Sequence, residues 1–94
     1  MKPEQLFFQF EELARRLEIR LVEDRGDFNG GRCRLQNESC IVLNKHRPIE
    51  QKLRVLALAF AELDLSTVYL MPVLRAYIDE VNLPLINNQP VEKS

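Results

Sequence analysis

Several residue types that build common functional sites are scarce in this chain of 94 residues. It has one histidine, two cysteines, three glycines and no tryptophan. A catalytic zinc site needs three protein ligands, and the only histidine, His46, has no second histidine or paired cysteines to join it. No Ser/His/Asp constellation can be proposed from one loop histidine either, because a catalytic base must be oriented by a partner. We therefore expect no enzyme activity, no catalytic residue, no metal and no cofactor.

Long apolar runs and a clear charge excess are also missing. No run approaches the roughly 20 apolar residues that span a bilayer, and the first residues mix charges with apolar side chains, unlike a signal peptide. The 13 Lys and Arg nearly balance the 14 Asp and Glu, for a net charge of -1, which disfavours a dedicated nucleic-acid binder. We expect a soluble, cytoplasmic protein in a reducing compartment.

The residues that are present predict a single small domain. Hydrophobic residues make up 46% of the chain and charged residues 29%, which is ordinary globular composition. A helix is predicted from Pro3 onward, because apolar residues recur at helical spacing along one face. These residues are Leu6, Phe7, Phe10, Leu13, Ala14 and Leu17. A short strand is predicted at residues 18–23, followed by a loop over 24–31 whose glycines suit a turn with positive φ.

Two strand-like runs, 31–36 and 40–44, predict a hairpin. If Asn37, Glu38 and Ser39 form its loop, the hairpin has one apolar face and one polar face. The apolar face would hold Cys33, Leu35, Ile41 and Leu43. This register points Cys33 into the core and Cys40 to the opposite face, so the two cysteines cannot form a disulfide within the hairpin.

The most apolar segment follows as a predicted helix that starts near Pro48. It is apolar nearly all round, so it must be covered on more than one side, by the hairpin and by the terminal helices. A last helix is predicted from Pro72 to Asn82, and residues 83–94 are expected to form an extended or frayed tail. The prediction is therefore one α+β domain over residues 1–82. Its three-stranded, mostly antiparallel sheet would carry an N-terminal helix, a buried central helix and C-terminal helices on one face.

This order of elements resembles the core of the zincin-like metallopeptidases, in particular the bacterial type that cleaves repressors. In that family the helix after the hairpin carries His-Glu-x-x-His, which binds Zn²⁺. Here Ala57 and Ala61 stand at the histidine positions and Leu58 at the glutamate position, so the resemblance implies a degenerate core without activity. The chain also resembles a small family of uncharacterised bacterial proteins, through residues 30–34, 43–45 and 69–75, and that resemblance implies no known activity.

Two surfaces are candidate binding sites. The first is basic: two arginines on the polar face of the hairpin and three residues that directly follow it could form one patch for an anion, an acidic protein or an RNA backbone. These residues are Arg32, Arg34, Lys45, His46 and Arg47. The alternative is a solvated strand face whose arginines pair with nearby acids, and His46 is read as a solvated loop histidine. No aromatic residues interleave with the cations, which disfavours nucleic acid.

The second surface is an apolar corner made by Tyr69, Leu70, Met71 and Pro72. It would be either a docking surface or a lid over the core. Our leading functional prediction is a non-catalytic protein-interaction module with an unidentified protein partner. It could also self-associate as a homodimer through an open sheet edge. The rival predictions are an anion or RNA-backbone binder and an inactive metallopeptidase-like domain.

Overall fold

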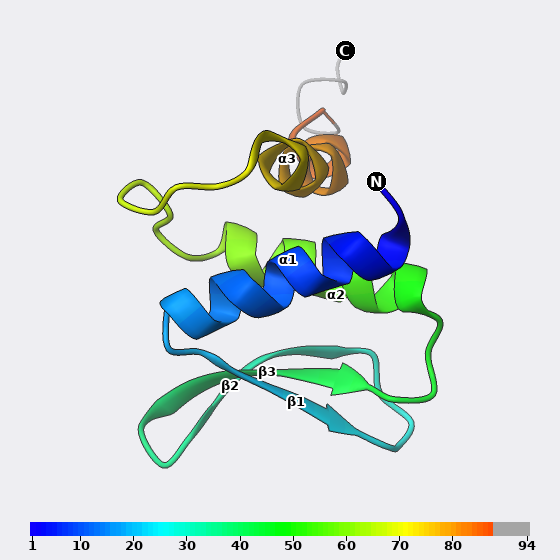
Figure 1. Cartoon of the computed structure of the whole chain (residues 1–94). Coiled ribbons are helices and arrows are strands. Elements are labelled where there is room, and N and C mark those ends of the chain that lie inside the picture. Colours follow the sequence, from blue (N-terminus) through cyan, green and yellow to red (C-terminus); the bar gives the residue numbers. More distant parts are fainter. Residues whose placement is uncertain (88–94) are drawn as a thin grey trace.

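The computed structural model describes residues 1–87, with side chains as far as residue 83. In chain order the elements are α1 (Pro3–Arg16), β1 (Arg20–Asp24), β2 (Gly30–Leu35), β3 (Glu38–Asn44), α2 (Ile49–Ala61) and α3 (Pro72–Asn87). All three helices lie on one face of the sheet, with α1 and α2 next to it and α3 above them (Figure 1). The predicted α+β fold is confirmed, and no helix of the described residues lies on the other face of the sheet.

The sheet has the strand order β1-β3-β2. β1 pairs with β3 in parallel, and β2 pairs with β3 antiparallel. The sheet is therefore mixed, with one pair of each kind, where the sequence had suggested a mostly antiparallel one. Because β1 pairs with β3 rather than with β2, its neighbour in sequence, β1 and β2 form the two edges of the sheet.

The hairpin register predicted from the sequence is wrong. Gln36 and Asn37 form a two-residue turn, with φ of 52° and 69°, and Cys33 pairs with Cys40. Two central residues at positive φ give the turn type whose twist matches that of the flanking strands. The apolar pattern of β2 could not fix the register, because β2 is an edge strand that is exposed along most of its length.

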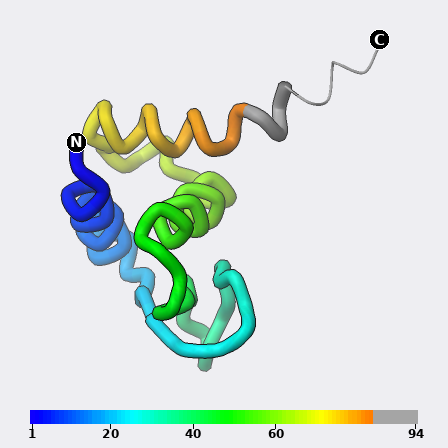
Figure 2. Tube along the Cα trace, turned by 90° about the vertical axis from the view of Figure 1, so that its right-hand side faces the viewer, coloured from blue at the N-terminus to red at the C-terminus, as the bar shows by residue number. Residues whose placement is uncertain are grey.

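Helix α2 is sandwiched as predicted. It packs against β2 and β3 on one side and against α1 and α3 on the other (Figure 2). Phe60 of α2 stacks on Phe10 of α1 with ring centroids 5.7 Å apart, and the edge of Tyr77 from α3 meets Phe10 at 6.1 Å. Aromatic pairs of this kind add about 0.5–1.5 kcal/mol beyond their burial. One aromatic cluster therefore joins the three helices.

Helix α3 begins at Pro72, as predicted, but continues beyond Asn82 to Asn87. The Asn82 amide donates to the carbonyl of Ile78 in its own helix, at 2.7 Å, and to that of Ala57 in α2, at 3.3 Å. These bonds tie this turn of α3 to α2, so Asn82 does not end the helix. The predicted tail thus overlaps the helix over residues 83–87, and its remainder, 88–94, lies outside the described residues.

Candidate functional site

Strand β2 presents a free edge. Among residues 1–87 its only strand partner is β3. The turn places Leu35 opposite Glu38, and a β-turn of this kind is closed by a hydrogen bond between its first and last residues. Hydrogen-bonded pairs alternate along an antiparallel ladder, so Cys33 bonds to β3 while the main-chain groups of Arg32 and Arg34 point away from it. In the described part of the chain, these two arginines make no main-chain hydrogen bond outside the sheet.

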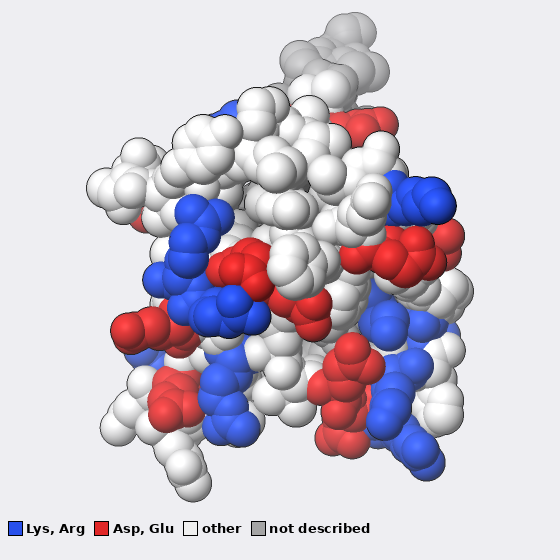
Figure 3. Space-filling view, in the orientation of Figure 1, with Lys and Arg blue, Asp and Glu red and all other residues white. Residues whose placement is uncertain are grey.

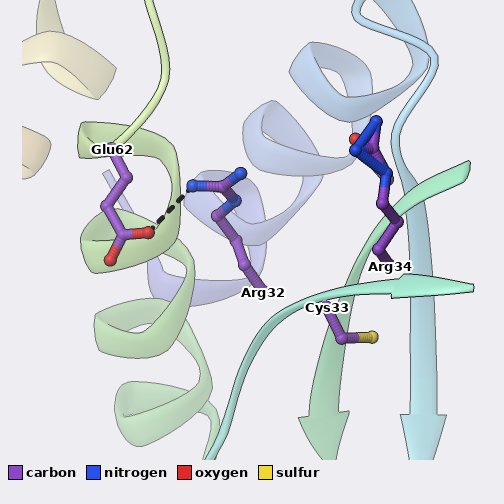
Figure 4. A pocket seen from close by; sticks show the side chains of 5 residues that line it. Arg32, Cys33, Arg34 and Glu62 are labelled. Carbon is purple, nitrogen blue, oxygen red and sulfur yellow. Dashed lines mark hydrogen bonds and ion pairs between the residues drawn. The ribbon is translucent and has the colours of Figure 1, made fainter. Parts of the chain in front are cut away.

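The side chains of Arg32 and Arg34 project toward the helical side of the sheet. Their cross-strand partners are Ile41 and Ser39, and Ile41 is fully buried under the helices. Arg32 donates to Glu62 at the end of α2, with an N–O distance of 2.9 Å, whereas Arg34 has no ion pair among the described residues. Figure 4 shows both arginines on one side of β2 and the Cys33 side chain on the other.

Two shallow hollows lie along β2. One, of about 380 Å³, is lined by Arg32, Cys33, Arg34, Ser39 and Glu62. The other, of about 270 Å³, lies between β2 and α2 and is lined by Asn29, Gly30, Gly31, Arg32, Val55, Leu58, Ala59 and Glu62. They share Arg32 and Glu62, so they adjoin along the strand. Together they give a long, open and partly apolar depression rather than an enclosed pocket.

The two cysteines occupy the open face of the sheet, which none of the helices α1, α2 and α3 covers. Cys33 and Cys40 are direct cross-strand partners, and their sulfur atoms lie 2.8 Å apart. Cys33 is exposed, whereas Cys40 on the central strand is only 2% exposed. The predicted placement is therefore reversed: Cys33 is not a core residue, and both thiols share one face. The hydrogen bond with Cys33, and then burial, raise the pKa of the Cys40 thiol.

The five residues of the predicted basic patch do not come together. Lys45 follows β3 at the end opposite Ser39, the cross-strand partner of Arg34. Lys45 is six residues further along the chain than Ser39, which at about 3.3 Å per residue is about 20 Å. Lys45 and His46 are exposed, and Arg47 is half-buried beside them. In the face seen in Figure 3, Lys and Arg are interspersed with Asp and Glu, as in the alternative reading of a solvated surface.

The predicted apolar corner is divided by the structure. Leu70 is buried with the core, whereas Tyr69 is 72% exposed, and Met71 and Pro72 are also exposed. The main-chain carbonyl of Tyr69 accepts a hydrogen bond from Arg16 at the end of α1, at 3.0 Å. Leu70 therefore anchors this segment to the core, and only its neighbours are available to a partner.

The three residues of α2 that the sequence comparison set against the metallopeptidase motif differ in burial. Ala57 is fully buried, Leu58 is half-buried and Ala61 is exposed. Within residues 1–87, no group of three or more His, Cys, Asp or Glu side chains is placed to hold a metal ion. No helix in the described residues has the length and apolar character needed to cross a membrane.

Asn44 is a key residue that the sequence analysis did not single out. It is the one buried polar residue among those described, and its amide donates to the carbonyls of Gly26 and Phe28, at 2.8 and 2.5 Å. Its side-chain oxygen accepts a hydrogen bond from the His46 amide at 3.0 Å. Asn44 thus holds the loop before β2 in place. The sequence signal that could have pointed to Asn44 is its position as a polar residue at the end of a strongly apolar strand.

No family model matches the chain, and no curated protein or solved structure matches it.

Proposed function

We propose that this chain is a non-catalytic protein-interaction module that binds an extended, acidic segment of a partner protein along the free edge of β2. The observation that carries the proposal is the uncovered edge of β2, which is bordered by a depression and by two arginines. Adding a strand to an exposed edge is a recurrent way to bind peptides. In that mode main-chain hydrogen bonds supply affinity and alternate side chains supply specificity.

The main-chain groups needed for strand addition belong to alternate residues of β2. The main-chain groups of Arg32 and Arg34 point away from β3. The hollow that Glu62 helps to line lies beside them on the helical side of the sheet. Gly30 has the same orientation at the start of the strand, where it lines the second hollow. An incoming strand would therefore find three successive positions at which it could donate and accept hydrogen bonds.

The side chains of β2 define the chemistry of the partner. On the helical side, the residues of an added strand would face Arg32 and Arg34, and opposite charges across a strand pair stabilise it. The Arg32–Glu62 ion pair is solvent-exposed, so it is worth little and an incoming carboxylate can replace Glu62. On the open face the neighbours would be Cys33 and Leu35, and Leu35 is 51% exposed. A segment in which acidic and apolar residues alternate fits both faces.

Self-association through β2 is less well supported than binding of another protein. Antiparallel pairing of two copies about Cys33 would set Arg32 of each copy against Arg34 of the other, and like charges directly opposite destabilise a sheet. The anion or RNA-backbone alternative loses support because Lys45, His46 and Arg47 lie at the far end of the sheet. The relationship to the zincin-like core stays a prediction.

The test uses a fluorescent peptide of alternating Glu and Val and its counterpart of alternating Lys and Val. We expect anisotropy titrations to show binding of the Glu-Val peptide only, and exchange protection of the Arg32 and Arg34 amides in the complex. Methylating the peptide amides that face β2 should abolish binding, because it removes the main-chain donors while leaving the charges unchanged. If the methylated peptide binds equally well, the interaction is general electrostatic attraction and the strand-addition proposal is wrong.

A matched pair of variants locates the site. Arg34→Ala should weaken binding of the Glu-Val peptide about tenfold, the loss of one charge-assisted contact. Lys45→Ala removes the same charge from an exposed position at the other end of the sheet and should leave binding unchanged. Equal losses in both variants would support one broad basic patch instead.

A further inference from the structure

The open face of the sheet carries a pair of thiols, one on β2 and one on β3. Cys33 and Cys40 are cross-strand partners whose sulfur atoms lie 2.8 Å apart on the open face of the sheet. They form a hydrogen-bonded pair of the ladder, for which Cα atoms are about 5.5 Å apart. Disulfides in proteins usually span Cα distances of about 4.4–6.8 Å. The hairpin therefore already holds both thiols within the distance that a disulfide requires.

We propose that Cys33 and Cys40 are a thiol modification site that small-molecule disulfides convert into an intrachain disulfide across β2 and β3. This chemistry does not depend on what binds the edge of β2. It also reverses the prediction from the sequence, in which the wrong hairpin register placed the two cysteines on opposite faces.

The different exposure of the two thiols sets the order of the steps. Cys33 is exposed, so its thiolate attacks one sulfur of the small-molecule disulfide, forms a mixed disulfide and releases one small thiolate. Cys40 is almost completely buried and is not the first to react. Its thiolate then attacks the Cys33 sulfur, forms the intrachain bond and releases the second small thiolate. Two protein thiols lose two protons and two electrons, and the reagent is reduced to two thiols.

The surroundings of Cys40 favour the second step once the first has occurred. In the dithiol form, the hydrogen bond with Cys33 and then burial raise the pKa of Cys40, while the nearby Arg20 cation opposes them. A mixed disulfide on Cys33 has no thiol or thiolate to hold that hydrogen bond. The largest cause of the raised pKa is then removed, and Arg20, the cross-strand neighbour of Cys40, still stabilises the thiolate. Glu38, the remaining charged neighbour, acts against it.

The experiment exposes the reduced protein to oxidised glutathione and follows its intact mass and free thiols. The wild-type protein should lose two hydrogen atoms and both free thiols while remaining a single chain. Cys40→Ser should stop at one glutathione adduct on Cys33. Cys33→Ser should react at least about tenfold more slowly than Cys40→Ser, because only the buried thiol remains. Stable glutathione adducts on the wild-type protein, disulfide-linked dimers, or equal rates for the two variants would each overturn the proposal.

A measurement on the wild-type protein makes the result independent of how well the variants fold. The ratio of intrachain disulfide to glutathione adduct reports how closely the second thiol is held to the first. In urea the two cysteines become the ends of a flexible loop, whose effective concentration is only millimolar. We expect the ratio to fall at least about tenfold in urea, because the native hairpin holds the thiols in contact. An unchanged ratio would show that the fold does not position the pair.

Discussion

The side-chain amide of Asn44 donates to the main-chain carbonyl of Phe28 at 2.5 Å and so joins the end of β3 to the loop before β2. The same amide reaches the Gly26 carbonyl, and the side-chain oxygen accepts from His46. A single buried side chain therefore fixes both the loop between β1 and β2 and the start of the connection to α2. Because β2 is an edge strand, its alignment depends on this loop as well as on its pairing with β3.

We expect Asn44→Ala to lower the free energy of unfolding by about 3 kcal/mol. The substitution removes three part-buried hydrogen bonds, each of which contributes about 0.5–1.5 kcal/mol. Urea unfolding followed by circular dichroism measures the effect. Asn29→Ala is the matched control, since Asn29 is exposed and makes only a long contact of 3.4 Å with Gln51. Equal effects of the two substitutions would contradict the role assigned to Asn44.

Gly30 should tolerate no side chain. A Cβ atom at this position would lie 2.5 Å from the carbonyl oxygen of Val42, and its φ of 105° is rarely adopted by other residues. Gly30→Ala should lower the free energy of unfolding by about 2–4 kcal/mol, from backbone strain and overpacking. Gly31→Ala is the control: it has a strained φ as well, but its Cβ would meet nothing within 4 Å. In urea unfolding, Gly31→Ala should lower the free energy of unfolding by clearly less than Gly30→Ala does. A larger loss for Gly31→Ala than for Gly30→Ala would refute the steric explanation.

Much of the helical layer could be predicted because its signals are local. The apolar stripe from Leu6 to Leu17 and the prolines at helix starts depend only on spacing within a few residues. Pro3 and Pro72 are the first residues of α1 and α3, and Pro48 is the N-cap of α2. The all-round apolar character of α2 correctly indicated a helix covered on two sides. Helix packing could therefore be inferred before any contact was known.

The sheet was less predictable because its pairings are not local. β1 skips β2 and pairs in parallel with β3, and no sequence pattern in either strand encodes that choice. The hairpin register depends on positive φ at Gln36, a residue type that does not mark such a turn. The candidate site inherited the register error: Cys33 and Cys40 were assigned to opposite faces, and cations near the two ends of β3 were joined into one patch.

The end of α1 offers a stabilising substitution. Glu18 has φ of 59° just after the helix, the Ile19 amide donates to Ala14 and the Glu18 amide donates to Arg15. This arrangement is a Schellman motif, whose left-handed position is usually glycine. Glu18→Gly should raise the free energy of unfolding by about 0.5–1 kcal/mol, since the relief of backbone strain exceeds the added entropy of the unfolded chain. Glu18→Ala keeps the strain and should show no such gain in urea unfolding.

The reduced protein should lose stability at alkaline pH through Cys40. The pKa of this thiol is raised in the folded state, first by the hydrogen bond with Cys33 and then by burial, so the folded protein binds its proton more tightly than the unfolded chain does. That contribution is complete below the pKa of an unfolded cysteine, about 8.5, and is lost as pH rises through the higher folded value. Urea unfolding between pH 7 and 10 should show the decline in the reduced protein.

The same protein with the Cys33–Cys40 disulfide formed is the control for this pH dependence. It carries no thiol to titrate, so the part of the decline that belongs to Cys40 should disappear. Arg20 and Glu38, the charged neighbours of Cys40, are present in both forms and cancel in the comparison. Identical pH profiles for the reduced and oxidised forms would show that Cys40 does not contribute.

The charges on β2 should keep the chain monomeric, and reversing one of them should change that. In antiparallel self-pairing about Cys33, Arg32 of each copy faces Arg34 of the other, so two like-charged pairs oppose the dimer. In Arg34→Glu both pairs become attractive, which favours the dimer by about 1–3 kcal/mol relative to the wild type. Sedimentation velocity over a concentration series should show a monomeric wild-type protein and a concentration-dependent dimer for Arg34→Glu.

Lys45→Glu makes the same change in net charge at an exposed residue outside β2, so it separates pairing at the edge from a general effect of charge. It should remain monomeric at every concentration at which Arg34→Glu associates. Arg34→Ala should fall between the wild type and Arg34→Glu, because it removes the repulsion without adding an attraction. A wild-type dimer, or equal association of the two charge reversals, would mean that the edge of β2 is not the surface that governs self-association.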